Sequence, residues 1–210
     1  GSKLAWPTVG ILFLMLVFSA SVRFSAIFGL RASEGLFATR YLEHPIVASV
    51  HMITGITFLL LAPLQFSKKF RNRNFTRHRI LGRVLLACAF FSGLYGLLAS
   101  VQFPAFGGVS SLAAVWFFGA VFTFSIVRSL WCARNKKIAE HREWMIRTFA
   151  IGLGVGTQRL LNGPFLLSGY EFIDSFGPTL WLGFATNLLI AETWINLGKK
   201  KSGKPAAGVK

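Results

Sequence analysis

Acidic residues are scarce in this sequence of 210 residues, which has 7 Asp and Glu against 23 Lys and Arg. Charged residues of both signs make up only 14% of the chain, whereas 53% of it is hydrophobic. Such a composition leaves too little polar surface to cover a water-soluble domain of this length. The composition therefore argues against a soluble fold and for a membrane protein.

Cysteine is also scarce, and the two cysteines, Cys88 and Cys132, lie within or at the end of apolar runs. Their spacing fits no metal site, and neither is placed to meet the other in a disulfide. The motifs of P-loop ATPases, nucleophile-elbow hydrolases and HExxH metalloproteases are absent as well. ATP-driven transport and hydrolysis of the kind that soluble enzymes perform therefore have no support.

The net charge of +16 does not indicate a nucleic-acid partner. Nucleic-acid binders carry their basic residues on a soluble framework, whereas here these residues fall between long apolar runs. We therefore interpret the charge as a determinant of membrane topology.

Six apolar stretches are long enough to cross a bilayer, which takes about 20 helical residues. They cover residues 6–30, 44–66, 80–101, 109–132, 144–167 and 178–197. The first is too long for a signal-peptide core and is counted as a helix. We predict an all-α polytopic membrane protein with a single transmembrane domain over residues 1–198 and a basic tail over residues 199–210.

The loops predict the orientation of the chain, because Lys and Arg are retained on the cytoplasmic side of a membrane. The connections after the second and fourth spans and the two termini carry almost all of the basic residues. On the other side the charges cancel, and they are Arg23, Arg31, Glu34, Arg40, Glu43, Arg159, Glu171 and Asp174. We therefore expect both termini in the cytoplasm and a multi-pass protein of a bacterial inner membrane.

Two similar motifs point to a candidate site. HRILGR begins at His78 and HREWMIR begins at His141, and each leads into a span that runs outward from the cytoplasmic side. If the hairpins are pseudo-repeats, the two histidines lie at equal depth near the inner surface. The residues assigned to this inner-face site are Gln65, His78, Arg79, Arg83, His141, Arg142 and Arg147.

Two further ionisable residues lie inside predicted spans, where an unpaired charge is costly. Glu192 in the sixth span is expected to pair with Arg83 or Arg147, or to carry a proton. His51 in the outer part of the second span lies far from the inner-face site, and it serves either a proton-linked role or a polar lock between helices. His44 is on the same helix, so it cannot be the opposite axial ligand of a haem bound by His51.

The remaining small and polar residues are interpreted as having structural roles. Glycines in the third and fifth spans permit close helix approach, and they are Gly93, Gly96, Gly152, Gly154 and Gly156. Arg159 lies near the outer end of the fifth span, where we expect it to reach the surface or pair with Glu171 or Asp174.

The residues from His51 through Pro63-Leu64-Gln65-Phe66 and the two His-Arg motifs to Arg159 resemble the bacterial membrane-protein family called domain of unknown function 2306. The resemblance extends over the second to fifth spans. It implies a multi-helix membrane fold with His51, His78 and His141 as functional positions, and it supplies no established reaction. The arrangement is also similar, more loosely, to di-haem transmembrane cytochromes of the b type, although this chain lacks a second outer histidine on another helix.

Two functions remain open. In the first, His78 and His141 ligate the iron of one b-type haem, Arg79, Arg83 or Arg142 pair with its propionates, and the protein exchanges electrons with a quinone or a partner protein. In the second, the same cationic site holds an anionic lipid headgroup or phosphate. His51 and Glu192 then serve proton-linked transport or a structural lock. The sequence assigns neither a catalytic residue nor an oligomeric state.

Overall fold

A computed structural model of the protein describes residues 2–29, 42–103 and 106–201. The helices in this part of the chain are α1 (Ser2–Ile27), α3 (Pro45–Phe66), α4 (Lys68–Arg73), α5 (Phe75–Gln102), α6 (Gly108–Arg134), α7 (Ile138–Gly152), α8 (Gly154–Leu167) and α9 (Phe172–Lys201). The predicted all-α class is confirmed. Arg31, Glu34, Arg40, the end of the first predicted span and the tail beyond residue 201 lie outside the described residues.

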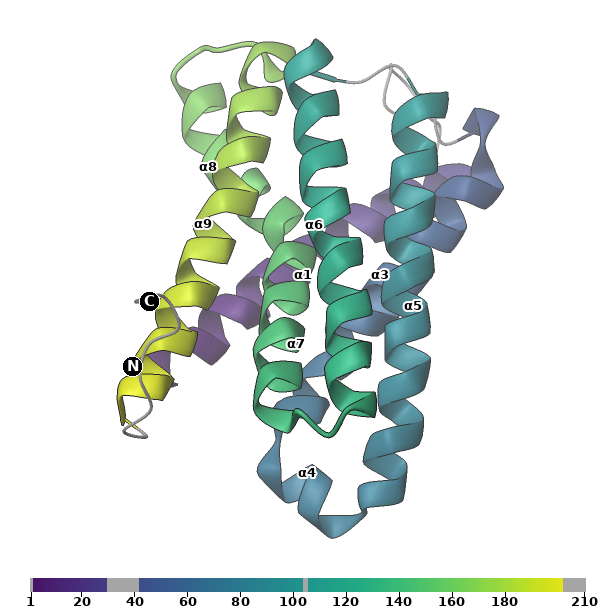
Figure 1. The fold of residues 1–210 in the computed structure, drawn as a ribbon. Coiled ribbons are helices and arrows are strands. Elements are labelled where there is room, and N and C mark those ends of the chain that lie inside the picture. The colour runs from purple at the N-terminus through teal and green to yellow at the C-terminus, as the bar shows by residue number, and fades with distance from the viewer. Residues whose placement is uncertain (1, 30–41, 104–105, 202–210) are drawn as a thin grey trace.

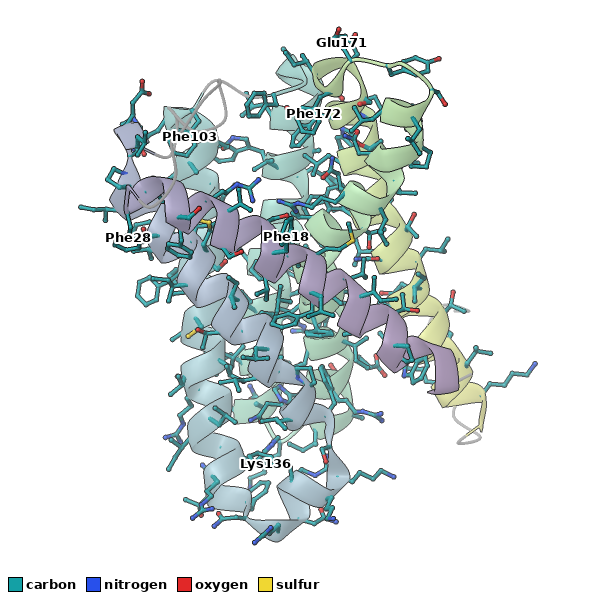
Figure 2. The ribbon with its side chains drawn as sticks, turned by 180° about the vertical axis from the view of Figure 1, so that it is seen from behind. Phe18, Phe28, Phe103, Lys136, Glu171 and Phe172 are labelled. Atoms are coloured by element: carbon teal, nitrogen blue, oxygen red, sulfur yellow. The ribbon has the colours of Figure 1, made fainter. Side chains whose placement is uncertain are left out.

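The long helices run in alternating directions, as a multi-pass chain requires (Figure 1). One end of the bundle carries α4 and the turn between α6 and α7, and α9 finishes toward it; we call this the basic end. Lys136 lies there, whereas Glu171 and Phe172 lie at the opposite end (Figure 2). Within the described residues, four helical segments are long and apolar enough to span a bilayer by themselves, namely Pro7–Ser25 within α1, and α3, α5 and α6.

Two helix starts at the basic end differ from the prediction. The third span was predicted from residue 80, but α5 begins at Phe75 because the Asn74 side chain accepts a hydrogen bond from the Arg77 backbone N at 2.9 Å. Ser67 likewise accepts from the Phe70 N at 3.2 Å and starts α4, which was not predicted. Hydropathy locates the hydrocarbon layer rather than the helix ends. A helix that begins in the aqueous layer is therefore longer than its apolar stretch.

The predicted fifth span over residues 144–167 is interrupted. It consists of α7 and α8, which meet at Leu153 between two glycines. A Cβ atom added at Gly154 would lie 2.2 Å from Cδ1 of Phe184, and one added at Gly152 would lie 3.1 Å from Cδ2 of Leu59. Glycine has low helix propensity, so a helix is easily interrupted where two glycines lie close together. The missing side chains of these two glycines let the neighbouring helices pack closely at the break.

Helix α9 is longer at both ends than the predicted sixth span over residues 178–197. It includes Lys199, which the sequence placed in the tail. The Lys199 ammonium pairs with the Glu143 carboxylate of α7 at 2.9 Å, and both side chains are about one-fifth exposed. The first part of the expected tail is therefore a helix end that is anchored to the bundle.

The core is a ring of four helices in which α3 packs on α5, α5 on α6, α6 on α7, and α7 on α3. Helices α5 and α7 therefore lie on a diagonal. The ring of Phe58 on α3 meets the rings of Phe122 on α6 and Phe149 on α7 edge-on, with centroids 6.4 and 6.3 Å apart. All three rings are buried, so they form an aromatic layer in the core.

The charge asymmetry predicts that the basic end faces the cytoplasm. In a cysteine-free background, we expect a cysteine at the exposed Asn72 of α4 to react with a membrane-impermeant maleimide only after bacterial spheroplasts are opened. A cysteine at the exposed Glu171 should react in intact spheroplasts. Reaction of the Asn72→Cys variant from outside would reverse the orientation.

Gly154→Ala is expected to lower the free energy of unfolding by about 1–3 kcal/mol, because the new methyl group overlaps the Phe184 ring. Gly163→Ala on the same helix is the matched control, since an added Cβ there meets no atom within 4 Å. Denaturant unfolding in mild detergent measures both. Equal stability of the two variants would mean that α8 and α9 are further apart than the structure places them.

Candidate functional site

His78 and His141 occupy equivalent places at the starts of α5 and α7. Each is the fourth residue after its helix N-cap, and its backbone N bonds to the carbonyl oxygen of that cap, Asn74 at 3.1 Å and Lys137 at 2.9 Å. Both helices start at the basic end (Figure 1). The two motifs therefore place their histidines alike, in the first turn of diagonal helices.

The His141 ring is held in one orientation. Its Nδ1 lies 2.9 Å from the Ser129 carbonyl oxygen of α6, and because a carbonyl only accepts, Nδ1 carries the hydrogen. In the neutral ring Nε2 then keeps its lone pair. Metal-binding histidines are commonly oriented by a bond of this kind. His141 thus offers Nε2 to a ligand.

Two polar residues of other helices lie at the same end of the bundle as His141. His78 lies within electrostatic range of the His141 ring. Gln65, in the last turn of α3, packs against α5 beside Gly82, where an added Cβ would lie 3.5 Å from the Gln65 Oε1. Among the described residues, Gln65 Nε2 and His78 Nδ1 are buried side-chain atoms without a hydrogen-bond partner. Because such atoms are nearly always paired, they mark a polar site, and we call Gln65, His78 and His141 the inner cluster.

Arg147 is not part of that cluster. Its Nε and Nη2 donate to the two carboxylate oxygens of Glu192 at 2.5 and 2.9 Å, and its guanidinium lies 4.4 Å from the centroid of the Trp144 ring. The predicted pairing of Glu192 is confirmed, with Arg147 rather than Arg83 as the partner. The pair joins α7 to α9, so it supports the polar-lock interpretation of Glu192.

The other arginines assigned to the site are Arg79, Arg83 and Arg142, and all three are exposed at the basic end. The Arg79 guanidinium lies 6.0 Å from the centroid of the Phe75 ring. The described contacts do not join these arginines to the inner cluster. These arginines supply positive charge at the same end of the bundle, but they make no direct hydrogen bond to the polar atoms of the inner cluster in the described contacts.

His51 is bound to α5 by a reciprocal pair of hydrogen bonds. Its Nδ1 donates to the Ser92 carbonyl oxygen at 2.8 Å, and the Ser92 hydroxyl donates to the His51 carbonyl oxygen at 3.2 Å. Gly96 makes room for the ring, since an added Cβ there would lie 3.0 Å from the His51 Cε1. His51 therefore locks α3 to α5, and in its neutral form it also keeps a lone pair on Nε2.

A cavity of about 650 Å³ lies beside His51, which the sequence did not predict. It is bounded by residues of α1, α3, α5, α6, α7, α8 and α9, and seven phenylalanines line it. Phe103 and Phe172 are among them, and both lie toward the end opposite Lys136 (Figure 2). The cavity thus occupies the half of the bundle away from the inner cluster.

Polar residues of α8 contribute to the wall of this cavity. Gln158 donates to the Thr179 hydroxyl oxygen at 3.3 Å, that hydroxyl donates to the Ser175 carbonyl oxygen at 2.6 Å, and the Asn162 Oδ1 lies 3.2 Å from the same hydroxyl. Arg159 also lines the cavity, and its Nη1 donates to the Val155 carbonyl oxygen at 3.0 Å. The sequence analysis expected Arg159 to reach the surface or to pair with Glu171 or Asp174, and did not place it in a cavity wall. The signal that could have located this wall is the run of polar residues, Gln158, Arg159 and Asn162, within one apolar span.

Residues 48–195 match the model of the family DUF2306, which is described as a predicted membrane protein. The chain belongs to this family. It is accordingly an integral, multi-pass membrane protein, and the resemblance noted from its His-Arg motifs is confirmed. Comparisons with curated proteins and with solved structures give no match.

The DUF2306 match contains both polar sites, because it runs from the residues just before His51 in α3 to residue 195, toward the end of α9. The first helix, α1, lies outside it and still contributes Leu16, Ala20 and Arg23 to the cavity wall. The looser likeness to b-type cytochromes gains no support from these comparisons.

Glu192→Ala is expected to lower the free energy of unfolding by about 2 kcal/mol, since it removes two charge-assisted hydrogen bonds from a partly exposed pair. Arg147→Ala should cost at least as much, and the double variant should cost less than the two losses together. Thr193→Ala is the control, because its hydroxyl bonds only to the carbonyl of its own helix at Leu189. Strict additivity in a double-mutant cycle would contradict the pairing.

Proposed function

We propose that the protein holds one b-type haem at the inner cluster, between His78 and His141. The observation that carries the proposal is the Nδ1–H bond of His141 to the Ser129 carbonyl, which leaves Nε2 in the form that binds iron. His78 stands at the same position on the diagonal helix, within electrostatic range. His78 and His141 would be the residues that hold the haem iron.

The residues around the two histidines suit the remainder of a haem. Gln65 Nε2 is a buried donor without a partner, and a propionate would accept its hydrogen bond. Arg79, Arg83 and Arg142 supply positive charge at the same end of the bundle for the propionates. When bound, the haem supplies one-electron chemistry, while the chain orients it and excludes water from it. A quinone or a membrane protein would be the partner in electron exchange.

A second candidate function is the binding of an anionic lipid headgroup or phosphate. The unpartnered Gln65 N–H favours it, together with the N-termini of α5 and α7, whose dipoles attract anions. In this function a protonated His141 would donate from Nε2 to a phosphate oxygen. The Arg147–Glu192 pair would remain a structural lock in both functions.

An absorbance spectrum tests the proposal directly. Protein purified from cells supplied with a haem precursor should show the Soret band and the reduced α band of a bis-histidine haem. His78→Ala and His141→Ala should each remove this spectrum. His44→Ala should retain it, because His44 lies at the opposite end of the bundle beside Phe103.

Two outcomes would contradict the haem. A colourless wild-type protein that retains phosphate or an anionic lipid, and loses it in the His78→Ala variant, would establish the second function instead. A haem spectrum that both histidine variants preserve would place the haem elsewhere.

A further inference from the structure

We propose that the cavity beside His51 binds a lipid-soluble hydroquinone, with His51 Nε2 accepting a hydrogen bond from a ring hydroxyl. The inference concerns the half of the bundle away from the inner cluster. It does not depend on a haem, and the two proposals can fail separately.

The first argument is the orientation of His51. Its Nδ1–Cε1 edge faces α5, where Ser92 accepts the Nδ1 hydrogen and Gly96 leaves room for the ring. The side chain is nevertheless exposed, and it lines the cavity. The atom that remains for a ligand is Nε2, which in the neutral ring is an acceptor. A ligand that satisfies it must bring an O–H or N–H donor.

The second argument is the shape of the polar wall on α8. Asn162 is 3% exposed and lines the same cavity. Its Oδ1 lies 3.2 Å from the Thr179 hydroxyl oxygen, and its amide hydrogens are donors that it can turn to a ligand. A cavity with an acceptor on α3 and a donor on α8 suits a head group with oxygen atoms on both sides. A para-hydroquinone ring has this arrangement.

The third argument is the composition and size of the cavity. Phenylalanines dominate its aromatic lining, and Phe118 stacks on Phe184 with centroids 4.8 Å apart. Such rings favour contact with another aromatic ring. The volume of about 650 Å³ is within the range of roughly 300–1,000 Å³ typical of ligand sites. One aromatic ring would leave much of it empty, so the apolar remainder fits a hydrocarbon tail.

The fourth argument is the depth of the cavity. Much of its wall comes from α1, α3, α5 and α6, which are the helices apolar enough to span a bilayer, and the tilted α1 crosses the bundle on this side (Figure 2). A ligand would therefore enter from the hydrocarbon layer rather than from water. A fatty acid shares the tail but carries an acid head, so it is the competing amphiphile to test.

The experiment uses purified protein in lipid nanodiscs, titrated anaerobically with a decyl-substituted hydroquinone and, separately, with decanoic acid. Calorimetry measures binding, and empty nanodiscs correct for partition into lipid. The wild-type protein should bind the hydroquinone saturably and more tightly than the acid. His51→Ala should weaken the hydroquinone about tenfold, the effect of losing roughly one hydrogen bond.

Because His51 also joins α3 to α5, a second variant tests the cavity without changing His51. Gly163 lines the cavity, and an added Cβ there meets no atom within 4 Å, so Gly163→Leu adds bulk to the cavity without an immediate clash. It should abolish saturable binding, whereas Gly198→Leu, at an equally open position outside the cavity, should leave binding unchanged. Undiminished binding in both His51→Ala and Gly163→Leu would overturn the site. Tighter binding of decanoic acid would overturn the ligand class. A colourless protein that binds hydroquinone would contradict only the haem.

Discussion

An imidazole inside a helix bundle in lipid needs an acceptor for its ring N–H, and for His51 and His141 the acceptor is a backbone carbonyl of a neighbouring helix. His51 donates to Ser92, and His141 donates to Ser129. A carbonyl oxygen that accepts a hydrogen bond within its own helix has a second lone pair for the imidazole. The residue four positions after the serine is small in both cases, Gly96 and Ala133. These two bonds join α3 to α5 and α7 to α6. They also decide that each ring offers Nε2 to a ligand, and both proposed sites depend on that choice.

The two sites share the helix pair of α3 and α5 but lie toward opposite ends of it. Helix α3 carries His51 in one half and Gln65 at the basic end, and α5 lies beside both. Polar contacts also hold the interrupted α7 and α8 against α9, since Asn187 accepts from the Thr157 hydroxyl at 2.9 Å and donates to the Ala150 carbonyl oxygen at 3.0 Å. The break at Leu153 is therefore compensated by bonds to α9, and it lets the wall of the cavity diverge from the direction of α7.

Much of the fold could be predicted from the sequence, because apolar length measures the hydrocarbon layer directly. The partner of Glu192 could also be predicted from the sequence, since a carboxylate in a span needs a cation at the same depth. The cavity could not be predicted, because a phenylalanine that faces lipid and one that lines a cavity have the same hydropathy. Arg159 shows this limit: its position along the span was correct, but which side of the helix it occupies depends on packing against α9. Helix α4 and the break between α7 and α8 depend on caps and close glycine contacts, which an apolar run does not record.

The measurement that tests the account most directly is nitrogen-15 NMR of histidine-labelled protein that has been freed of bound haem and of other ligands. The chain has only 4 histidines, so single His→Ala variants assign the signals of His51 and His141. The account predicts that in both rings Nδ1 carries the hydrogen and Nε2 is bare. A hydrogen on Nε2 with a bare Nδ1 in either ring would contradict it, because that ring could not donate to its carbonyl and would have no lone pair to offer a ligand.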